Sequence, residues 1–224
     1  MFHMNNNILS GLTLVLLLTA MTVSAESGVT TSYDVDSVIR LRTTTGNPAA
    51  GQAKSELCQG CHGENGISIE PNTPNLAGQY SKYTYKQIRD FKSGLRTNPI
   101  MNGIAAFVSD SDLGDIAAYF ASQTKMRGDG SEGNQLGKRL FLDGDMSRMM
   151  VGCINCHGVN GKGMTPNNSV FPVIGGQKKE YVSGQLVNFR EGNRSNSPGG
   201  VMNIIAQKMT DAEIEALADY VSRL

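Results

Sequence analysis

Apolar side chains recur at helical spacing in several stretches of this chain, with polar residues between them. The two clearest stripes lie at matching places in the two halves and consist of Leu113, Ile116, Ala117 and Phe120 and of Ile214, Leu217, Ala218 and Val221. Such spacing is typical of amphipathic helices. The same reasoning predicts helices over residues 48–59, 80–93, 133–143 and 178–191. No convincing strand alternation is found, so the sequence predicts an all-α fold.

Residues that favour helix ends lie at the borders of these stretches. Pro48 suits the first turn of a helix, and Gly94 and Gly192 suit the position just after a last turn. Ser109 to Asp112 and Thr210 to Glu213 have the spacing of a capping box, in which two side chains satisfy free backbone N–H groups at a helix start. We therefore expect the last helix of each half to begin at these residues.

The first 25 residues are expected to lie outside the fold. Residues 8–20 are an apolar run too short for a comfortable membrane span, and Val23-Ser24-Ala25 has the small-x-small pattern of a cleavage site. We expect a signal peptide over residues 1–25, an exported mature chain, and an N-terminal extension over residues 26–47. Because no Lys or Arg precedes the apolar run, an uncleaved anchor is the alternative.

The rest of the chain is a tandem repeat. CQGCH at 58–62 matches CINCH at 153–157, an offset of 95 residues. Downstream, PNLAGQ at 74–79 matches PVIGGQ at 172–177, an offset of 98. FKSGLR, which begins at Phe91, matches FREGNR, which begins at Phe189, at the same offset. We therefore expect one duplicated unit, with short insertions in loops of the second copy.

The repeat sets the expected domain organisation. The sequence predicts a first domain over residues 48–123 and a second over residues 133–224, each made of a few helices. The polar, glycine-rich stretch over residues 124–132 is predicted to be the linker.

Composition narrows the functional classes. The 224 residues are 39% hydrophobic and 18% charged, which is ordinary for a soluble globular protein. The 20 Lys and Arg residues balance the 20 Asp and Glu residues. A chain without excess positive charge lacks the electrostatic footprint of nucleic-acid binding, so we expect no nucleic-acid partner.

All four cysteines lie in the two repeated motifs, Cys58-x-x-Cys61-His62 and Cys153-x-x-Cys156-His157. C-x-x-C-H is the sequence for covalent attachment of a c-type haem. The two thiols bond to one edge of the porphyrin, and the adjacent histidine is an axial ligand of the iron. We therefore predict two covalently bound haem c groups.

Other uses of paired cysteines fit the sequence less well. A thioredoxin-like dithiol needs a βαβ context that the pattern lacks, and a disulfide within either motif would close a tiny loop and stabilise little. The two cysteine pairs of a zinc site usually lie about 15–20 residues apart. Here ninety-one residues separate Cys61 from Cys153.

The histidine count limits the sixth ligand of each iron. The chain has three histidines, His3, His62 and His157, and His3 belongs to the predicted signal peptide. Ligation by two histidines is therefore excluded unless the signal peptide is retained. The sixth position is either open or filled by another residue. Methionine is the usual partner and raises the reduction potential relative to histidine.

Met101 and Met202 are the predicted methionine ligands, because no other methionine has a counterpart in the other copy. Each is expected in a Pro- or Gly-containing loop before the last helix, 39 and 45 residues after its histidine. The cluster of Met146, Met149 and Met150 is predicted to be a loop or interface feature. Met149 or Met150 is the alternative ligand for the second haem.

Two further matched pairs suggest supporting contacts. An axial histidine needs its second ring nitrogen held, often by a carbonyl, and Pro74 and Pro172 occupy matching loops. Their carbonyls are candidates, with simple turn formation as the alternative. Arg96 and Arg194 also match and are candidates to pair with haem propionates; a solvated arginine is the alternative.

These residues together resemble the cytochrome c4 family of dihaem cytochromes c. The resemblance covers residues 48–224 and is carried by AAGQAKSELCQGCHGENG, PNLAGQY, FKSGLRTNPIM, DLGDIAAYFASQ, CINCHGVNGKG, GGQKKEYVSGQLVNFREGNR and DAEIEALADYVSRL. It implies two class I cytochrome c domains packed around a pseudo-twofold axis, with the haem propionates facing each other. The extension over residues 26–47 and the methionine-rich SRMMVG depart from the family pattern.

The expected function is electron transfer and not catalysis on a substrate. The resemblance implies a periplasmic one-electron carrier in a respiratory chain, between a quinol-oxidising complex or dehydrogenase and a terminal oxidase. The alternatives are a dihaem redox enzyme of the peroxidase or thiosulfate dehydrogenase type, and a haem subunit of a larger dehydrogenase. The sequence leaves peripheral association with a membrane open.

Overall fold

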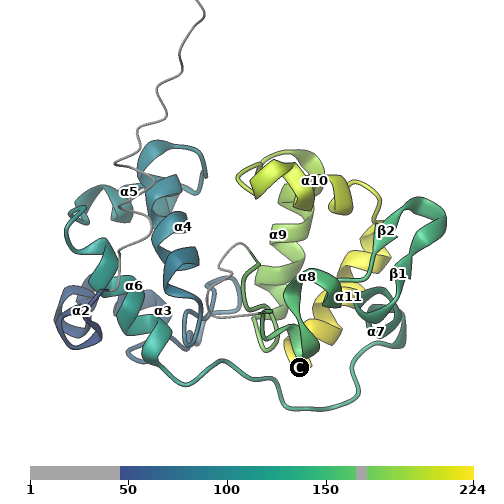
Figure 1. Cartoon of the computed structure of the whole chain (residues 1–224), viewed down its shortest axis with the longest axis horizontal. Helices are drawn as coiled ribbons and strands as arrows, with labels where there is room; N and C mark the ends of the chain where they lie inside the picture. Colours follow the sequence, from purple (N-terminus) through teal and green to yellow (C-terminus); the bar gives the residue numbers. More distant parts are fainter. Residues whose placement is uncertain (1–45, 165–170) are drawn as a thin grey trace, which may run out of the picture.

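The computed structural model describes residues 46–164 and 171–224, so the predicted signal peptide and most of the N-terminal extension lie outside the described residues. The chain is mostly helical, as the sequence predicts (Figure 1). Its elements are α2 (Pro48–Lys54), α3 (Glu56–His62), α4 (Ser81–Ser93), α5 (Pro99–Phe107), α6 (Leu113–Ser122), α7 (Gln135–Leu142), β1 (Gly144–Asp145), η1 (Met146–Arg148), β2 (Met150–Val151), α8 (Ile154–His157), η2 (Val159–Gly161), α9 (Lys179–Glu191), η3 (Pro198–Gly200), α10 (Val201–Ala206) and α11 (Asp211–Arg223).

Figure 1 shows two groups of helices joined by an extended strand of chain. We call residues 46–123 the N-terminal unit and residues 135–224 the C-terminal unit. In each unit the first helix crosses the last one at a glycine. A Cβ added to Gly51 in α2 would lie 2.0 Å from the carbonyl oxygen of Asp115 in α6, and one added to Gly137 in α7 would lie 2.0 Å from that of Ala216 in α11. The missing side chain therefore lets the two backbones touch.

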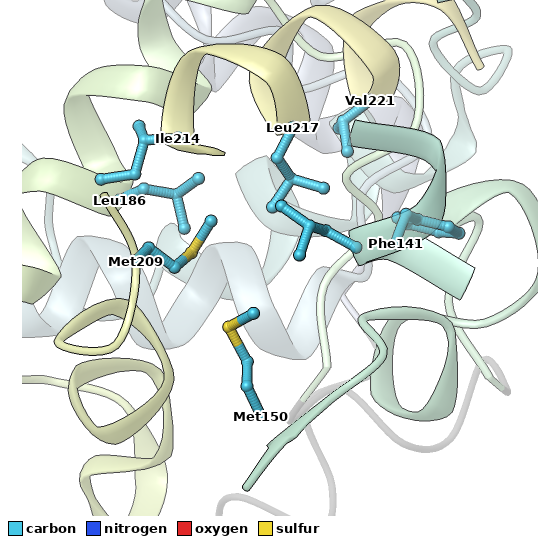
Figure 2. Close-up of a cluster of buried hydrophobic side chains, with 8 residues drawn as sticks. Phe141, Met150, Leu186, Met209, Ile214, Leu217 and Val221 are labelled. Atoms are coloured by element: carbon cyan, nitrogen blue, oxygen red, sulfur yellow. The ribbon is translucent and has the colours of Figure 1, made fainter. Parts of the chain in front are cut away.

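Each unit has its own apolar core. The core of the N-terminal unit comprises Ile88, Phe91, Ala105, Leu113, Ile116, Tyr119 and Phe120. The core of the C-terminal unit comprises Leu140, Phe141, Met150, Leu186, Met209, Ile214, Leu217 and Val221 (Figure 2). The amphipathic stripes predicted for the last helices thus face these cores. In the part of the chain that is described, no helix combines the length and apolar character needed to cross a bilayer.

Most predicted helix ends are found, with two corrections. Gly94 and Gly192 follow α4 and α9 with left-handed φ angles of 77° and 80°, and Thr210 and Glu213 form the expected capping box. The capping box predicted at Ser109 is wrong. The Ser109 hydroxyl donates to the Asp112 carboxylate (2.5 Å), and α6 begins at Leu113, directly after Asp112. The helix predicted over residues 48–59 is two helices, which meet at Ser55.

A small β-hairpin in the C-terminal unit was not predicted. β1 and β2 pair antiparallel, with Gly144 opposite Val151 and Asp145 opposite Met150. Arg148 at the tip donates to Asp145 (2.8 Å) and to both carboxylate oxygens of Glu213 in α11 (2.6 and 3.1 Å). Two-residue strands leave no periodicity in a sequence, which explains why alternation did not reveal them.

The two units meet along α4 and α9, which face each other in the centre of Figure 1. A small apolar cluster joins Tyr80 of the N-terminal unit, Met126 of the linker and Val173 of the C-terminal unit. All three side chains are buried. The two units are therefore in contact at this cluster, which lies close to the sites described next.

Candidate haem-binding sites

Each C-x-x-C-H motif lies on a helical turn that places its three side chains together. Cys58, Cys61 and His62 lie on α3, where residues three and four apart share one face. Cys153 immediately precedes α8, which contains Cys156 and His157. None of the four thiols is in a disulfide. Cys58 and Cys153 also pack against the two apolar cores.

The two histidines are buried and held in the same way. The Nδ1 atom of His62 lies 2.8 Å from the carbonyl oxygen of Pro74, and that of His157 lies 2.9 Å from the carbonyl oxygen of Pro172. A carbonyl oxygen only accepts, so each Nδ1 carries the proton and each Nε2 keeps its lone pair. The hydrogen bonds predicted from the matched prolines are therefore confirmed.

Burial favours the neutral form of both imidazoles. It lowers the pKa of His62 and of His157, and the hydrogen bond to each proline carbonyl opposes this only in part. A metal ligand must offer a neutral imidazole with a free nitrogen. Both histidines meet this requirement.

The thiols do not have the properties of a redox dithiol. Burial raises the pKa of Cys58 to about 11, with a smaller contribution from Cys61, and raises the pKa of Cys153 to about 12. Reactive cysteines have a lowered pKa, because the thiolate is the nucleophile. The environment instead favours neutral sulfur in an apolar setting, as a thioether has.

The two matched methionines lie on helices and not in the loops that the sequence predicted. Met101 is in the first turn of α5, which is capped by the side chain of Asn98 and begins with Pro99. Met202 is in α10, which follows the short turn η3. Both side chains are half-buried and contact the core of their own unit. Short helices that contain Pro or Gly at their start resemble loops in a sequence.

The methionine cluster divides into an exposed and a buried part. Met146 and Met149 are 67% and 75% exposed at the hairpin tip, whereas Met150 is 3% exposed within the core (Figure 2). Met149 points to solvent, so it lies unsuitably for a buried iron. Met150 points into the same cluster as Met209.

Two buried arginines form a ring across the interface. Arg96 donates to Gln87 (2.7 Å), and across the interface to Gln185 (2.9 Å). Arg194 donates to Gln185 (2.7 Å), and across the interface to Gln87 (3.1 Å). The two arginines are 8% and 7% exposed, so the alternative of a solvated arginine is wrong. The glutamines were missed in the sequence, although they match at the repeat offset of 98.

The ring also includes two tyrosines. Arg96 donates to the Tyr181 hydroxyl (2.9 Å) and Arg194 to the Tyr83 hydroxyl (3.1 Å). Burial would raise the pKa of Tyr181, but the two nearby guanidinium groups outweigh it and lower this pKa. The interface therefore has a positive field at its centre.

The positive charge of the two arginines shows whether haem fits between the units. Among the described residues, neither guanidinium forms an ion pair with a carboxylate; their partners are the neutral groups of the ring and Asn196. Buried charges normally need an opposite charge. Haem carries two propionates, which would supply negative charge at such an interface. Each unit also offers a thiol pair, an imidazole nitrogen and a thioether, so the residues present fit one haem per unit.

Comparison with known proteins shows the same pattern over both units. The cytochrome c family model matches residues 48–124 and 135–224. Cytochrome c4 of Pseudomonas aeruginosa is 43% identical over 187 residues, which cover 82% of this chain and 92% of that protein. The crystal structure of reduced recombinant cytochrome c4 from Pseudomonas stutzeri matches with a TM-score of 0.74 at 39% identity, covering 80% of this chain and 99% of that one.

A further relative has a name that mentions a partner. A protein of Stutzerimonas stutzeri named thiosulfate dehydrogenase electron acceptor is 36% identical over 185 residues. The match covers 80% of this chain and 81% of that protein.

Proposed function

This chain belongs to the cytochrome c4 family and binds two covalently attached haem c groups, and from that premise we propose that it is a periplasmic one-electron carrier. Bound haem supplies an iron that accepts and releases one electron without bond changes in a substrate. The carrier serves a respiratory chain, taking electrons from a quinol-oxidising complex or dehydrogenase and delivering them to a terminal oxidase.

In this proposal Cys58 and Cys61 attach the first haem, and Cys153 and Cys156 attach the second. His62 and Met101 are the axial ligands of the first iron. The support is the neutral imidazole with its free Nε2 and the half-buried thioether next to the same core.

The second iron is proposed to take His157 and Met202 by the same reasoning. The exposure of Met149 disfavours it as the alternative ligand, and the burial of Met150 in the core is explained by packing. Arg96 and Arg194 pair with the propionates, which would place both haems at the interface.

The observation that carries the proposal is the equivalence of the two sites. Each has the same histidine–carbonyl hydrogen bond, at 2.8 and 2.9 Å, and a methionine at the matching position. A dihaem enzyme usually needs one iron with an open or labile position, so its two sites should differ. Equivalent, fully ligated sites serve electron transfer, because no small molecule has a free place to bind.

Three measurements separate a carrier from an enzyme. The full chain, expressed with a c-type maturation system, is treated with cyanide and, separately, with thiosulfate and ferricyanide, which takes up the two electrons released when two thiosulfate ions join as tetrathionate. The proposal predicts slow or no cyanide binding and no turnover of thiosulfate, together with rapid reduction by membranes that contain a quinol-oxidising complex. Immediate cyanide binding at one haem, or tetrathionate formation by the protein alone, would support the enzyme alternative.

One relative favours a second candidate donor. Its name describes an acceptor of electrons from thiosulfate dehydrogenase and not the dehydrogenase itself. The chain would then be the same kind of electron carrier, but its electrons would come from the oxidation of thiosulfate. Reduction of this chain by added thiosulfate dehydrogenase and thiosulfate, faster than by the quinol-oxidising membranes, would assign that donor.

A further inference from the structure

Two glutamines in the repeated P-x-x-x-G-Q motif reach across the interface to the opposite unit. Gln79 of the N-terminal unit donates from Nε2 to the carbonyl oxygen of Val173 (2.8 Å) and accepts at Oε1 from the N–H of Val173 (3.0 Å). Gln177 of the C-terminal unit does the same to Asn75, with distances of 2.9 and 2.8 Å. Each carboxamide thus holds both backbone groups of one residue in the other unit.

The residues held in this way lie next to the carbonyls that hold the histidines. Val173 directly follows Pro172, whose carbonyl accepts from His157 Nδ1, and Asn75 directly follows Pro74, whose carbonyl accepts from His62 Nδ1. The chain of contacts therefore runs from Gln79 to the second-unit histidine, and from Gln177 to the first-unit histidine.

We propose that Gln79 and Gln177 are reciprocal positioning residues, each fixing the axial histidine of the opposite unit through the backbone beside its proline. This inference rests on the proposed function, because it takes His62 and His157 as iron ligands. It adds that each haem is tuned by a residue outside its own unit.

The glutamines are suited to this task because they are themselves fixed. Gln79 and Gln177 are 5% and 6% exposed. The Oε1 atom of each also accepts from the next backbone N–H, that of Tyr80 or Lys178, at 3.0 Å. A side chain locked by a local hydrogen bond and by burial holds its partner in one position.

Removal of one glutamine should act on the iron of the other unit. Among the described residues, the N–H and carbonyl of the 1% exposed Val173 bond only to Gln79, so in Gln79→Ala the backbone beside Pro172 moves to find new partners. The hydrogen bond to His157 then weakens, and the imidazole becomes a less basic ligand. A less basic ligand stabilises ferric iron less, so the reduction potential of the second haem rises.

The two glutamines should differ in the size of their effect. Asn75 keeps other anchors, since its side chain accepts from the N–H of Ser68 (3.0 Å) and donates to the carbonyl of Gly176 (3.2 Å). Val173 packs its apolar side chain against Tyr80 and Met126, but among the described residues that side chain forms no hydrogen bond. Gln79→Ala should therefore change the reduction potential of the second haem more than Gln177→Ala changes that of the first.

The test measures both reduction potentials of the holoprotein in the two single variants. Each variant is the matched control of the other, because each removes one pair of hydrogen bonds from the same interface. To assign a potential to a haem, the titrations are repeated in Met101→Ala and Met202→Ala backgrounds. In each background the long-wavelength band of thioether-ligated ferric iron reports on the one haem that keeps its methionine.

We expect Gln79→Ala to favour electron binding at the second haem by up to about tenfold, which for a one-electron couple is about 59 mV. Gln177→Ala should shift the first haem in the same direction by less. Gln79→Met keeps most of the side-chain volume and adds no charge but loses both hydrogen bonds, so it should shift the second haem in the same direction as Gln79→Ala, which also guards against a poorly folded alanine variant.

The inference would be overturned if the reduction potential of the haem in the same unit changed, if both potentials changed equally, or if neither changed. Equal shifts would indicate general loosening of the interface. If the methionine backgrounds fail to separate the band, the ligand assignment of the proposed function is wrong instead. The two reduction potentials still test the inference in that case. The inference requires Gln79→Ala to change one of the two potentials and Gln177→Ala to change the other.

Discussion

The helix crossing at Gly51 allows a stability prediction with a defined magnitude. A Cβ at this position would lie 2.0 Å from the carbonyl oxygen and 2.6 Å from the carbonyl carbon of Asp115, so α2 and α6 must separate by about 1 Å or more to admit alanine. The obstacle is backbone, and a change of rotamer cannot relieve it. The Asp115 carboxylate is also tied to α2, because it accepts from the N–H of Asn47 (2.7 Å).

Overpacking of this kind costs about 1–3 kcal/mol, and the backbone clash places Gly51→Ala near the upper end. Alanine returns about 1 kcal/mol through its higher helix propensity. We therefore expect a net loss of about 2 kcal/mol in the free energy of unfolding, measured by urea titration with far-UV circular dichroism. Gly137→Ala should behave alike, because its Cβ would also lie 2.0 Å from a carbonyl oxygen.

Gly184 in α9 is the matched control, because a Cβ there would meet nothing within 4 Å. Gly184→Ala should gain roughly 0.5–1 kcal/mol. If Gly51→Ala were as stable as the unchanged protein, the close crossing would not be what requires glycine, and the reasoning from backbone contact would be refuted.

Three smaller predictions concern the C-terminal unit. Thr210→Ala should lower the free energy of unfolding by about 1 kcal/mol, whereas Ser109→Ala, at the matching site that forms no capping box, should change it by less than about 0.5 kcal/mol in the same urea titration. The hydrogen bond from Arg148 lowers the pKa of Glu213 from 4.5 to about 2. This carboxylate therefore stabilises the fold above pH 4.5, and that stability is lost as the pH falls towards 2. The melting temperature of Glu213→Gln should change less with pH over this window than that of the unchanged protein, and an equal slope would contradict the ion pair's role. Met149 has a left-handed φ of 53° and is 75% exposed, so Met149→Gly should stabilise the protein by roughly 1 kcal/mol in thermal melts, and a loss would show that its side chain is needed.

The long helices and the cofactor sites could be predicted from the sequence because their signals are local. Apolar spacing revealed the last helix of each unit, and Gly94 and Gly192 marked two helix ends. The carbonyls of Pro74 and Pro172 could be proposed because the residues match across the repeat and a ligating histidine needs such a partner. In each case the structure needs a particular type of residue at a particular spacing, and few residues in the sequence satisfy that need.

The interface could not be predicted because its contacts join residues far apart in the chain. The ring joins Gln87 of α4 and Gln185 of α9 to Arg96 and Arg194, which lie in the loops after these helices, and no local pattern in the sequence indicates this arrangement. The available signal was identity across the repeat, since the glutamines recur at the offset of the arginines. The short helices α5 and α10 were missed for another reason: Pro99, Gly103 and the Pro198–Gly200 turn gave the appearance of loops.

The measurement that tests the central claim most directly is optical. The full chain is matured with haem, the haem content is counted by the pyridine haemochrome method, and the long-wavelength band of ferric iron bonded to methionine sulfur is recorded before and after Met101→Ala and Met202→Ala. The account predicts two haems per chain and a band that falls by about half in each variant and disappears in the double variant. A band that is unchanged in either variant, or one haem that lacks the band from the start, would contradict the proposal of two equivalent His/Met sites.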